Sequence, residues 1–263
     1  MARPPIKLCI FVTFHYVEAR LPYLRSVVSR FGELAEAVDA TVITNAGTAD
    51  ALKTITDLDP GGLERFATFT PFGLGHPYLL PWSHFVVARE KILDASFTHF
   101  LYLEDDLLVT QQTIRYLLAA TDALRRFGLL PAVFRVEMND RDGEWYSTDL
   151  VERVRIEACT RILPVNSDIG FINLPNPYQG MYFLERDLMT AHLSNITSNP
   201  DFGAGGLSWG IRERATQGLT FQDVPDGHIS RVVVPYRAGV GHGFLRQRTA
   251  LPIVKTEVEH GRK

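Results

Sequence analysis

Three consecutive carboxylates, Glu104, Asp105 and Asp106, directly follow four apolar residues at positions 100–103. Their mutual repulsion is costly at low dielectric unless a cation neutralises it. In an extended segment the side chains of residues i and i+2 point to the same side, so Glu104 and Asp106 are expected to lie together. Oxygen ligands of this kind suit Mg²⁺ or Mn²⁺, which also bind substrate phosphates. The triplet therefore predicts a divalent-metal and diphosphate site. The alternative is an ordinary acidic loop start or helix cap.

Strand and helix patterns alternate around this triplet. Apolar, β-rich runs predict strands at 8–13, 40–44, 66–70 and 100–103. Helical spacing of apolar residues predicts helices from Pro22, from Ser83 to about Asp94, and from about Gln111 to Phe127, where Gly128 ends the last one. Such alternation is typical of an open α/β sheet with parallel strands, which binds ligands beyond the carboxyl ends of its strands. The acidic triplet falls at that edge.

The second half of the chain is less regular. Its patterns predict strands at 132–137, 180–184 and 231–235, a turn at 140–143, and helices from about Asp187 and over 208–216. The sequence has no internal repeat, low-complexity tract or Gly/Ser linker, so a single domain is the simplest interpretation. The tail after Pro252 is polar and is expected to be loosely held.

The composition argues against several classes of function. Hydrophobic residues make up 46% of the 263 residues and charged residues 22%, which is typical of a globular protein with a sizeable core. A net charge of −3 gives no reason to expect nucleic acid as a partner. Cys9 and Cys159 show no metal-ligand spacing, and the apolar run at 8–14 is too short for a signal peptide or a membrane span. A cytoplasmic location is expected, from which a substrate at a membrane would be approached peripherally.

The segment FTHFLYLEDD, which ends in the acidic triplet, resembles the DxD strand of the GT-A glycosyltransferase superfamily. In that family the DxD carboxylates bind a divalent metal and the ribose and diphosphate of a nucleotide-sugar donor. The resemblance implies that Asp106 is a metal ligand and that Asp105 and Glu104 orient the ribose and the metal's waters. Glu104 departs from the family's usual first aspartate. The implied fold is α/β, a GT-A (Rossmann-like) open mixed sheet flanked by helices.

Other segments fit the same family pattern. The segment SHFVVARE resembles the helix before the metal motif, which implies that Arg89 reaches the diphosphate. Thr13 and Phe14 end the first expected strand, and Thr44 and Asn45 end the second, where the family holds the nucleoside. The alternative for Arg89 is an ordinary surface position on its helix.

Two late segments complete the resemblance. The glycine-flanked His242 lies where many family members place a histidine in the metal shell, and Arg246 with Arg248 could clamp the diphosphate. The segment WGIRE resembles the place where inverting members carry their general base, which implies that role for Glu213. The alternatives are a plain loop histidine, a solvated tail for the two arginines and a pairing of Glu213 with Arg212.

These features predict a metal-dependent glycosyltransferase in one domain, residues 1–263. Residues 1–110 are expected to form a nucleotide-binding half, 111–250 an acceptor half and 251–263 a tail. The donor is expected to be a UDP-sugar and the acceptor a hydroxyl of a carbohydrate or glycolipid. A retaining enzyme would need no base at Glu213. For an inverting one, the rival carboxylates are Asp168, Glu185 and Asp187.

Three other functions compete with this interpretation. A sugar-nucleotide pyrophosphorylase or nucleotidyltransferase needs a glycine-rich loop after the first strand, because backbone N–H groups cradle the triphosphate there. Here that place reads FHYVEAR, without glycine. A non-catalytic carbohydrate-binding protein would bind sugar and release no nucleotide. A metal-dependent phosphohydrolase would need more scattered Asp and His ligands.

Overall fold

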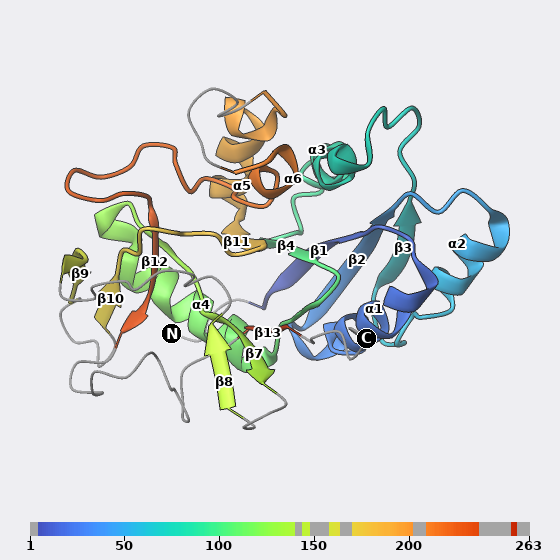
Figure 1. The fold of residues 1–263 in the computed structure, drawn as a ribbon, viewed down its shortest axis with the longest axis horizontal. Helices are drawn as coiled ribbons and strands as arrows, with labels where there is room; N and C mark the ends of the chain where they lie inside the picture. Colours follow the sequence, from blue (N-terminus) through green and yellow to red (C-terminus); the bar gives the residue numbers. More distant parts are fainter. Residues whose placement is uncertain are drawn as a thin grey trace. The chain divides into compact units, whose positions relative to one another are not determined.

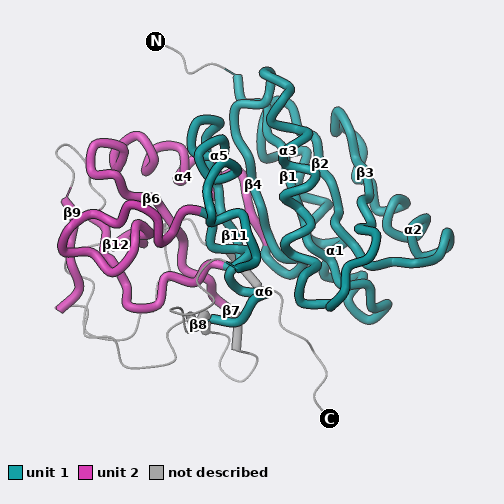
Figure 2. The backbone as a smooth tube through the Cα atoms, turned by 90° about the horizontal axis from the view of Figure 1, so that it is seen from above, with its two compact units in different colours: residues 1–107, 180–218 teal, residues 108–179, 219–263 magenta. Residues whose placement is uncertain are grey.

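The structure, a computed structural model, describes residues 5–139, 144–147, 158–163, 170–201, 209–236 and 254–256. The chain forms two compact units, coloured separately in Figure 2. The first unit comprises residues 1–107 and 180–218, and the second comprises 108–179 and 219–263. The acidic triplet belongs to the first unit, and so does the segment 180–218, although it follows the whole of 108–179 in sequence.

The first unit is built on a five-stranded sheet with the order β11-β4-β1-β2-β3 (Figure 1). Its strands are β1 (Lys7–Phe14), β2 (Ala37–Thr44), β3 (Arg65–Phe69), β4 (His99–Glu104) and β11 (Met181–Glu185). The first four run parallel, as the apolar runs predict, and β11 pairs antiparallel with β4. The open mixed sheet implied by the family resemblance is confirmed, whereas strand–helix alternation alone predicts only parallel strands.

Helices connect and cover these strands. The first unit holds η1 (Glu18–Arg20), α1 (Leu21–Val28), η2 (Phe31–Glu33), α2 (Ala49–Thr56), η3 (Pro77–Ser83), α3 (His84–Lys91), α5 (Arg186–Leu193), η6 (Ile196–Ser198) and α6 (Ile211–Arg214). Helix α2 contacts β3, α3 contacts β1, and α5 contacts both β4 and β11. The flanking helices that the fold class requires are therefore present.

Two predicted helices are shorter in the structure. The helix expected from Ser83 to about Asp94 is α3, which ends at Lys91, and Ser83 closes the preceding 3-10 helix without a side-chain capping bond. The helix expected over 208–216 is the four-residue α6, because Gly210 has extended backbone (φ −64°, ψ 167°) and the chain turns helical only at Ile211. Apolar spacing cannot detect either limit, since both are set by backbone conformation.

The second unit contains the long helix α4 (Gln111–Leu124) and two small sheets. The side chains and backbone of Thr110 and Thr113 form a reciprocal cap at the start of α4. The 3-10 turn η4 (Arg125–Phe127) follows, and Gly128 ends it with a left-handed backbone (φ 68°), as predicted. No helix in the described part of the chain is long and apolar enough to cross a lipid bilayer.

The strands of the second unit are short. One sheet has the order β6 (Leu130–Pro131), β12 (Val232–Tyr236), β10 (Gly170–Ile172) and β9 (Arg161–Ile162). In the other, β7 (Arg135–Asn139) lies between β13 (Val254–Thr256) and β8 (Glu144–Ser147), and β5 (Leu107–Leu108) stands where the chain passes from the first unit to the second. The pairing of β13 with β7 is a strand contact in the expected tail, which the sequence does not predict. The predicted turn at 140–143 lies outside the described residues.

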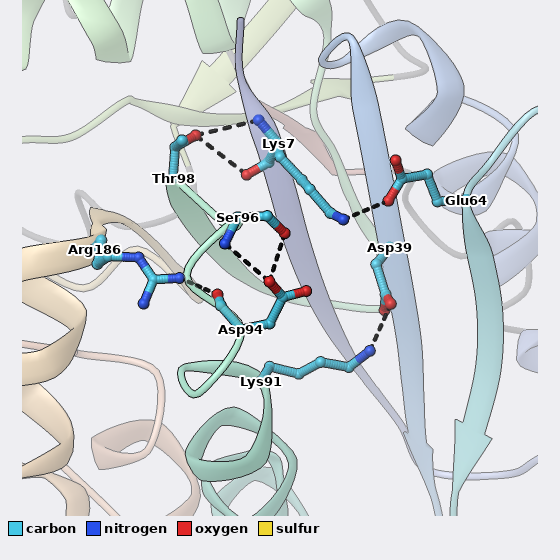
Figure 3. A network of polar contacts seen from close by, with 8 residues as sticks. All are labelled: Lys7, Asp39, Glu64, Lys91, Asp94, Ser96, Thr98 and Arg186. Carbon is cyan, nitrogen blue, oxygen red and sulfur yellow. Dashed lines mark hydrogen bonds and ion pairs between the residues drawn. The ribbon is translucent and has the colours of Figure 1, made fainter.

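A polar network holds the first unit together near the amino ends of its strands (Figure 3). Lys91, at the end of α3, forms a buried ion pair with Asp39 of β2, with Nζ and Oδ2 2.5 Å apart. Arg186 donates to the backbone oxygens of Phe97 (2.7 Å), Ile92 (2.8 Å) and Asp94. These bonds satisfy carbonyl groups after the end of α3 and fix the turn that leads into β4.

Candidate functional site

A pocket of about 380 Å³ lies at the carboxyl edge of β1 and β4, within the first unit. Among the described residues, five charged ones line it, three carboxylates and two arginines: Glu104, Asp105, Asp106, Arg20 and Arg212. Uncharged side chains and His15 complete the wall: Thr13, His15, Pro77, Tyr78, Leu80, Pro81 and Tyr102. The pocket is therefore at the edge where the strand pattern predicts ligand binding.

The acidic triplet straddles the end of β4. Glu104 is the last residue of the strand, while Asp105 and Asp106 lie in the turn after it. The rule that residues i and i+2 share a side holds for extended backbone and does not carry over to this turn. The turn brings the neighbours Asp105 and Asp106 onto one partner, Arg20. All three predicted carboxylates line the pocket.

Arg20 contacts both aspartates of the pocket. Its Nε donates to Asp105 Oδ2 and its Nη2 to Asp105 Oδ1, both at 2.9 Å. The same Nη2 also donates to Asp106 Oδ2 at 3.1 Å. Arg20 is not among the predicted site residues. The signal that could have revealed it is a basic residue in the loop after β1, because β1 lies beside β4 in the sheet.

Burial and the guanidinium act in opposite directions on Asp105. Its side chain is 8% exposed, and this burial raises the pKa of the carboxyl to about 6, while the hydrogen bonds from Arg20 lower it. In return, the hydrogen bonds with Asp105 raise the pKa of Arg20. Asp106 is less buried, with 31% of its side chain exposed. The negative charge of Asp105 is thus stabilised chiefly by one cation, Arg20.

Another part of the pocket wall comes from η3 and α6. Trp82 of η3 donates from Nε1 to the backbone oxygen of Ile211 at 2.7 Å, and Trp82, Phe85 and Ala215 share a small apolar core. This packing fixes the short helix that carries Arg212, whose side chain lines the pocket. Arg212 is a second pocket cation, for which the sequence predicts only a pairing with Glu213.

Glu213, the predicted base, pairs with Arg212. Its Oε1 accepts from Arg212 Nη2 at 2.9 Å and from Nε at 3.2 Å. Its other oxygen lies where a β-carbon on residue 210 would come within 2.5 Å, so Gly210 leaves room for this carboxylate. Glu213 is not among the pocket-lining residues. The structure therefore places it beside a pocket arginine, and its base role stays a prediction.

The predicted nucleoside residues lie at the ends of β1 and β2. Thr13 lines the pocket and accepts a hydrogen bond from the Tyr102 hydroxyl at 2.9 Å. Phe14 and Thr44 are fully buried. Asn45 accepts from the backbone N–H of Tyr16 at 2.7 Å and so ties the loop after β1 to the end of β2. Of these four residues, only Thr13 lines the pocket.

Arg89 contacts residues outside the pocket wall. Its Nη2 donates to Ser198 Oγ at 3.0 Å, and its Nη1 lies 3.4 Å from the backbone oxygen of Phe85. These contacts tie α3 to η6, and Arg89 is not a lining residue. The predicted residues His242 and Arg246 lie outside the described residues, as do Arg248 and the rival base Asp168.

A buried histidine fixes the part of the wall that η3 supplies. His84 contacts the backbone oxygen of Pro81 through Nδ1 and the Tyr182 hydroxyl through Nε2, the latter at 2.6 Å. A carbonyl oxygen only accepts, so Nδ1 carries the proton and Nε2 accepts from Tyr182. Burial lowers the pKa of His84 to about 3, which keeps the ring neutral. Tyr182 is buried against Tyr102 and does not line the pocket.

The described donor set does not fit the predicted divalent metal. Both oxygens of Asp105 and one of Asp106 already accept hydrogen bonds from Arg20. Among the residues that the structure describes, no three His, Cys, Asp or Glu side chains are grouped so that they could hold a metal ion. Mg²⁺ and Mn²⁺ prefer several oxygen ligands, so this arrangement favours a guanidinium over a metal at the two aspartates.

Comparison with known proteins gives likenesses in structure and none in sequence. No family model matches the sequence, and no curated protein matches it. The crystal structure of S. aureus TarS is similar to the chain with a TM-score of 0.46 and 12% sequence identity, over 87% of this chain and 35% of the TarS chain. The chain thus spans about a third of the length of the structure that it matches.

Proposed function

We propose that this chain is a glycosyltransferase that moves a sugar from a nucleoside diphosphate sugar to a hydroxyl acceptor. The observation that carries the proposal is the pocket at the carboxyl edge of β1 and β4, where two arginines stand among three carboxylates. Its volume of about 380 Å³ falls in the range of small-molecule sites. A phosphate-containing ligand is favoured because guanidinium groups match phosphate oxygens in geometry and charge.

Each part of a nucleotide sugar has a partner among the lining residues. The diphosphate is assigned to Arg20 and Arg212, and a ribose hydroxyl to Glu104 or Asp106, which accept hydrogen bonds. The exposed Tyr78 offers an aromatic face for the base or the sugar. We assign a UDP-sugar as donor and a carbohydrate or glycolipid hydroxyl as acceptor, in keeping with the family resemblance.

In the proposed reaction the chain contributes mainly electrostatic stabilisation of the leaving group. When the glycosidic bond to the donor's phosphate breaks, negative charge develops on the leaving diphosphate, and fixed guanidinium groups stabilise that charge. The acceptor hydroxyl must lose a proton to a base within hydrogen-bond reach if configuration inverts. The family resemblance implies a metal-dependent reaction, but no metal ion takes part in the proposed one, because Asp105 and Asp106 accept hydrogen bonds from Arg20.

Nucleotide release is the direct test of the proposed function. With Mn²⁺ supplied throughout, the wild type is expected to release UDP from one member of a UDP-sugar panel in the presence of sugar acceptors. Asp106→Ala is expected to lower kcat/KM by about 10- to 100-fold, because it removes one charge-assisted contact in the pocket. Asp57→Ala is the matched control, since Asp57 is exposed and pairs only with Lys53 among the described residues.

The alternatives give different products in the same experiment. A carbohydrate-binding protein would bind a sugar without releasing UDP. A pyrophosphorylase would form pyrophosphate from a nucleoside triphosphate and a sugar phosphate. Release of UDP at equal rates by the wild type and Asp106→Ala would refute the assignment of the pocket.

Glu213→Gln separates a base from a positioning residue. Glutamine keeps an oxygen that can accept from Arg212, so we expect KM for the donor to rise about three- to tenfold and kcat to change less than tenfold. A general base at this position would instead lower kcat by about 10²- to 10⁴-fold with little change in KM. Steady-state kinetics over donor concentration distinguish the two results. Glu90→Gln, on exposed helix surface, is the control.

A further inference from the structure

We propose that the Arg20 guanidinium is the resident counter-cation of Asp105 and Asp106, and that the pocket binds a nucleoside diphosphate without a divalent metal. The second half of this inference rests on the proposed function. The first half concerns the apoprotein alone and can be tested without any nucleotide.

The contact between Arg20 and Asp105 has the geometry of a bidentate ion pair. Two nitrogens of Arg20, Nε and Nη2, meet the two oxygens of Asp105 at equal distances of 2.9 Å. This is the parallel fork in which arginine and carboxylate fit best. Nη2 then extends the contact to Asp106 Oδ2 at 3.1 Å. One guanidinium therefore links two carboxylates in the way that a shared metal ion would.

Arg20 is held in place by its own segment of the chain. It ends η1, its backbone N–H donates to the Val17 oxygen at 2.9 Å, and it immediately precedes α1. Pro22 lies in the first turn of that helix and fixes the backbone direction. The guanidinium also lies 5.7 Å from the ring centre of Tyr23. Arg20 is thus anchored on both sides of its own position in the chain.

The balance of charge in the pocket also favours Arg20 over a metal ion. Three carboxylates and two arginines are the charged residues of the described pocket wall, and together they carry one net negative charge before any ligand enters. A nucleoside diphosphate brings further negative charge, and among the described lining residues the arginines that face it are Arg20 and Arg212. A divalent cation at Asp105 would have to displace Arg20 from a contact that is largely shielded from water, where charge repulsion between the two cations is strong. The guanidinium and the metal are therefore competitors for one place.

Titration with Mn²⁺ alone tests the competition. Calorimetry or Mn²⁺ electron paramagnetic resonance is expected to detect no saturable site in the wild type at millimolar Mn²⁺. Arg20→Met releases both aspartates from Arg20, so this variant is expected to bind Mn²⁺ at a saturable site, about 10- to 100-fold more tightly than the wild type does. Arg25→Met is the matched control because Arg25 is exposed on α1, and it should behave as the wild type. Circular dichroism establishes that each variant is folded. Arg20→Lys, which keeps a cation, should also bind no Mn²⁺.

Titration with UDP tests the consequence for ligand binding. The Kd of the wild type for UDP is expected to change less than threefold between EDTA and Mn²⁺, whereas Arg20→Met should lose about 10- to 100-fold in EDTA and recover part of it with Mn²⁺. Saturable Mn²⁺ binding by the wild type as tight as by Arg20→Met, or loss of UDP binding in EDTA, overturns the inference. Failure to bind UDP under every condition would refute the proposed function instead, and the Mn²⁺ titration would still decide the role of Arg20.

Discussion

Lys91→Met is expected to lower the free energy of unfolding by about 3–5 kcal/mol, because it leaves a buried carboxylate without its partner. Lys91 Nζ and Asp39 Oδ2 are 2.5 Å apart, and both side chains are at most 10% exposed. The other oxygen of Asp39 is buried and has no hydrogen-bond partner among the described residues. Lys91 is therefore the group that offsets the cost of burying the Asp39 charge. Urea denaturation at pH 7 measures the loss.

Two further variants make this prediction specific. Lys53→Met removes an ion pair of the same kind on the exposed face of α2, where the two side chains are 71% and 61% exposed, and should cost less than about 1 kcal/mol. The double variant Asp39→Asn/Lys91→Met removes the stranded charge and should be more stable than Lys91→Met alone. A double variant less stable than Lys91→Met would contradict the assigned cause, and equal losses in Lys91→Met and Lys53→Met would do so too.

The strands of the first unit were predictable because their sequences carry the signal of burial on both faces. The runs at 8–13, 40–44 and 100–103 lie within β1, β2 and β4, whose side chains are nearly all buried. The helix α2 carried a signal that apolar spacing does not use. Thr48 caps it by accepting from the N–H of Ala51 at 3.2 Å, so a search for capping residues would have found it.

The pocket was predictable in position and only partly in membership. The acidic triplet can be recognised in the sequence because three charged residues directly follow a buried strand. Arg20 cannot be recognised in this way, because it lies 85 positions before Asp105 and contacts it only because β1 and β4 are neighbours in the sheet. The same holds for the contact of His84 with Tyr182, which spans 98 positions and requires β11 to return beside β4. The local periodicity of a sequence does not give the order of strands in the sheet, so contacts between residues on neighbouring strands cannot be predicted from it.

Acidification is expected to destabilise the fold through two buried histidines, His84 and His192. Burial lowers the pKa of each ring to about 3, against an ordinary value of 6.5. The unfolded chain therefore binds more protons than the folded one between pH 6.5 and 3, and stability falls as pH falls through that window. Each ring contributes a slope of about 1.4 kcal/mol per pH unit. Asp105 acts in the opposite sense below pH 6, because burial raises its pKa to about 6 and its protonated form is favoured in the folded state.

The variant His192→Phe isolates the contribution of one histidine ring to the pH dependence of stability. His192 is fully buried, with its ring edge-on to Phe85 at 5.0 Å and to Tyr182 at 5.5 Å, so a phenyl ring suits its surroundings. At pH 7 the variant loses the contact of Nδ1 with Thr197 Oγ1. It also removes the buried Nε2, which has no hydrogen-bond partner among the described residues. The two effects oppose each other, so the free energy of unfolding is expected to change by no more than about 1 kcal/mol.

The decisive quantity for His192→Phe is the pH dependence of the difference from the wild type. Asp105 and His84 are present in both proteins and cancel in that difference. Between pH 6 and 4 the unfolding free energy of the variant should fall less steeply, by about 1.4 kcal/mol per pH unit, so that the variant becomes the more stable protein in acid. Parallel stability curves for the two proteins would mean that His192 is protonated in the folded state near its ordinary pKa. That result would require water or a carboxylate beside a ring that the structure buries among Phe85, Tyr182 and Thr197.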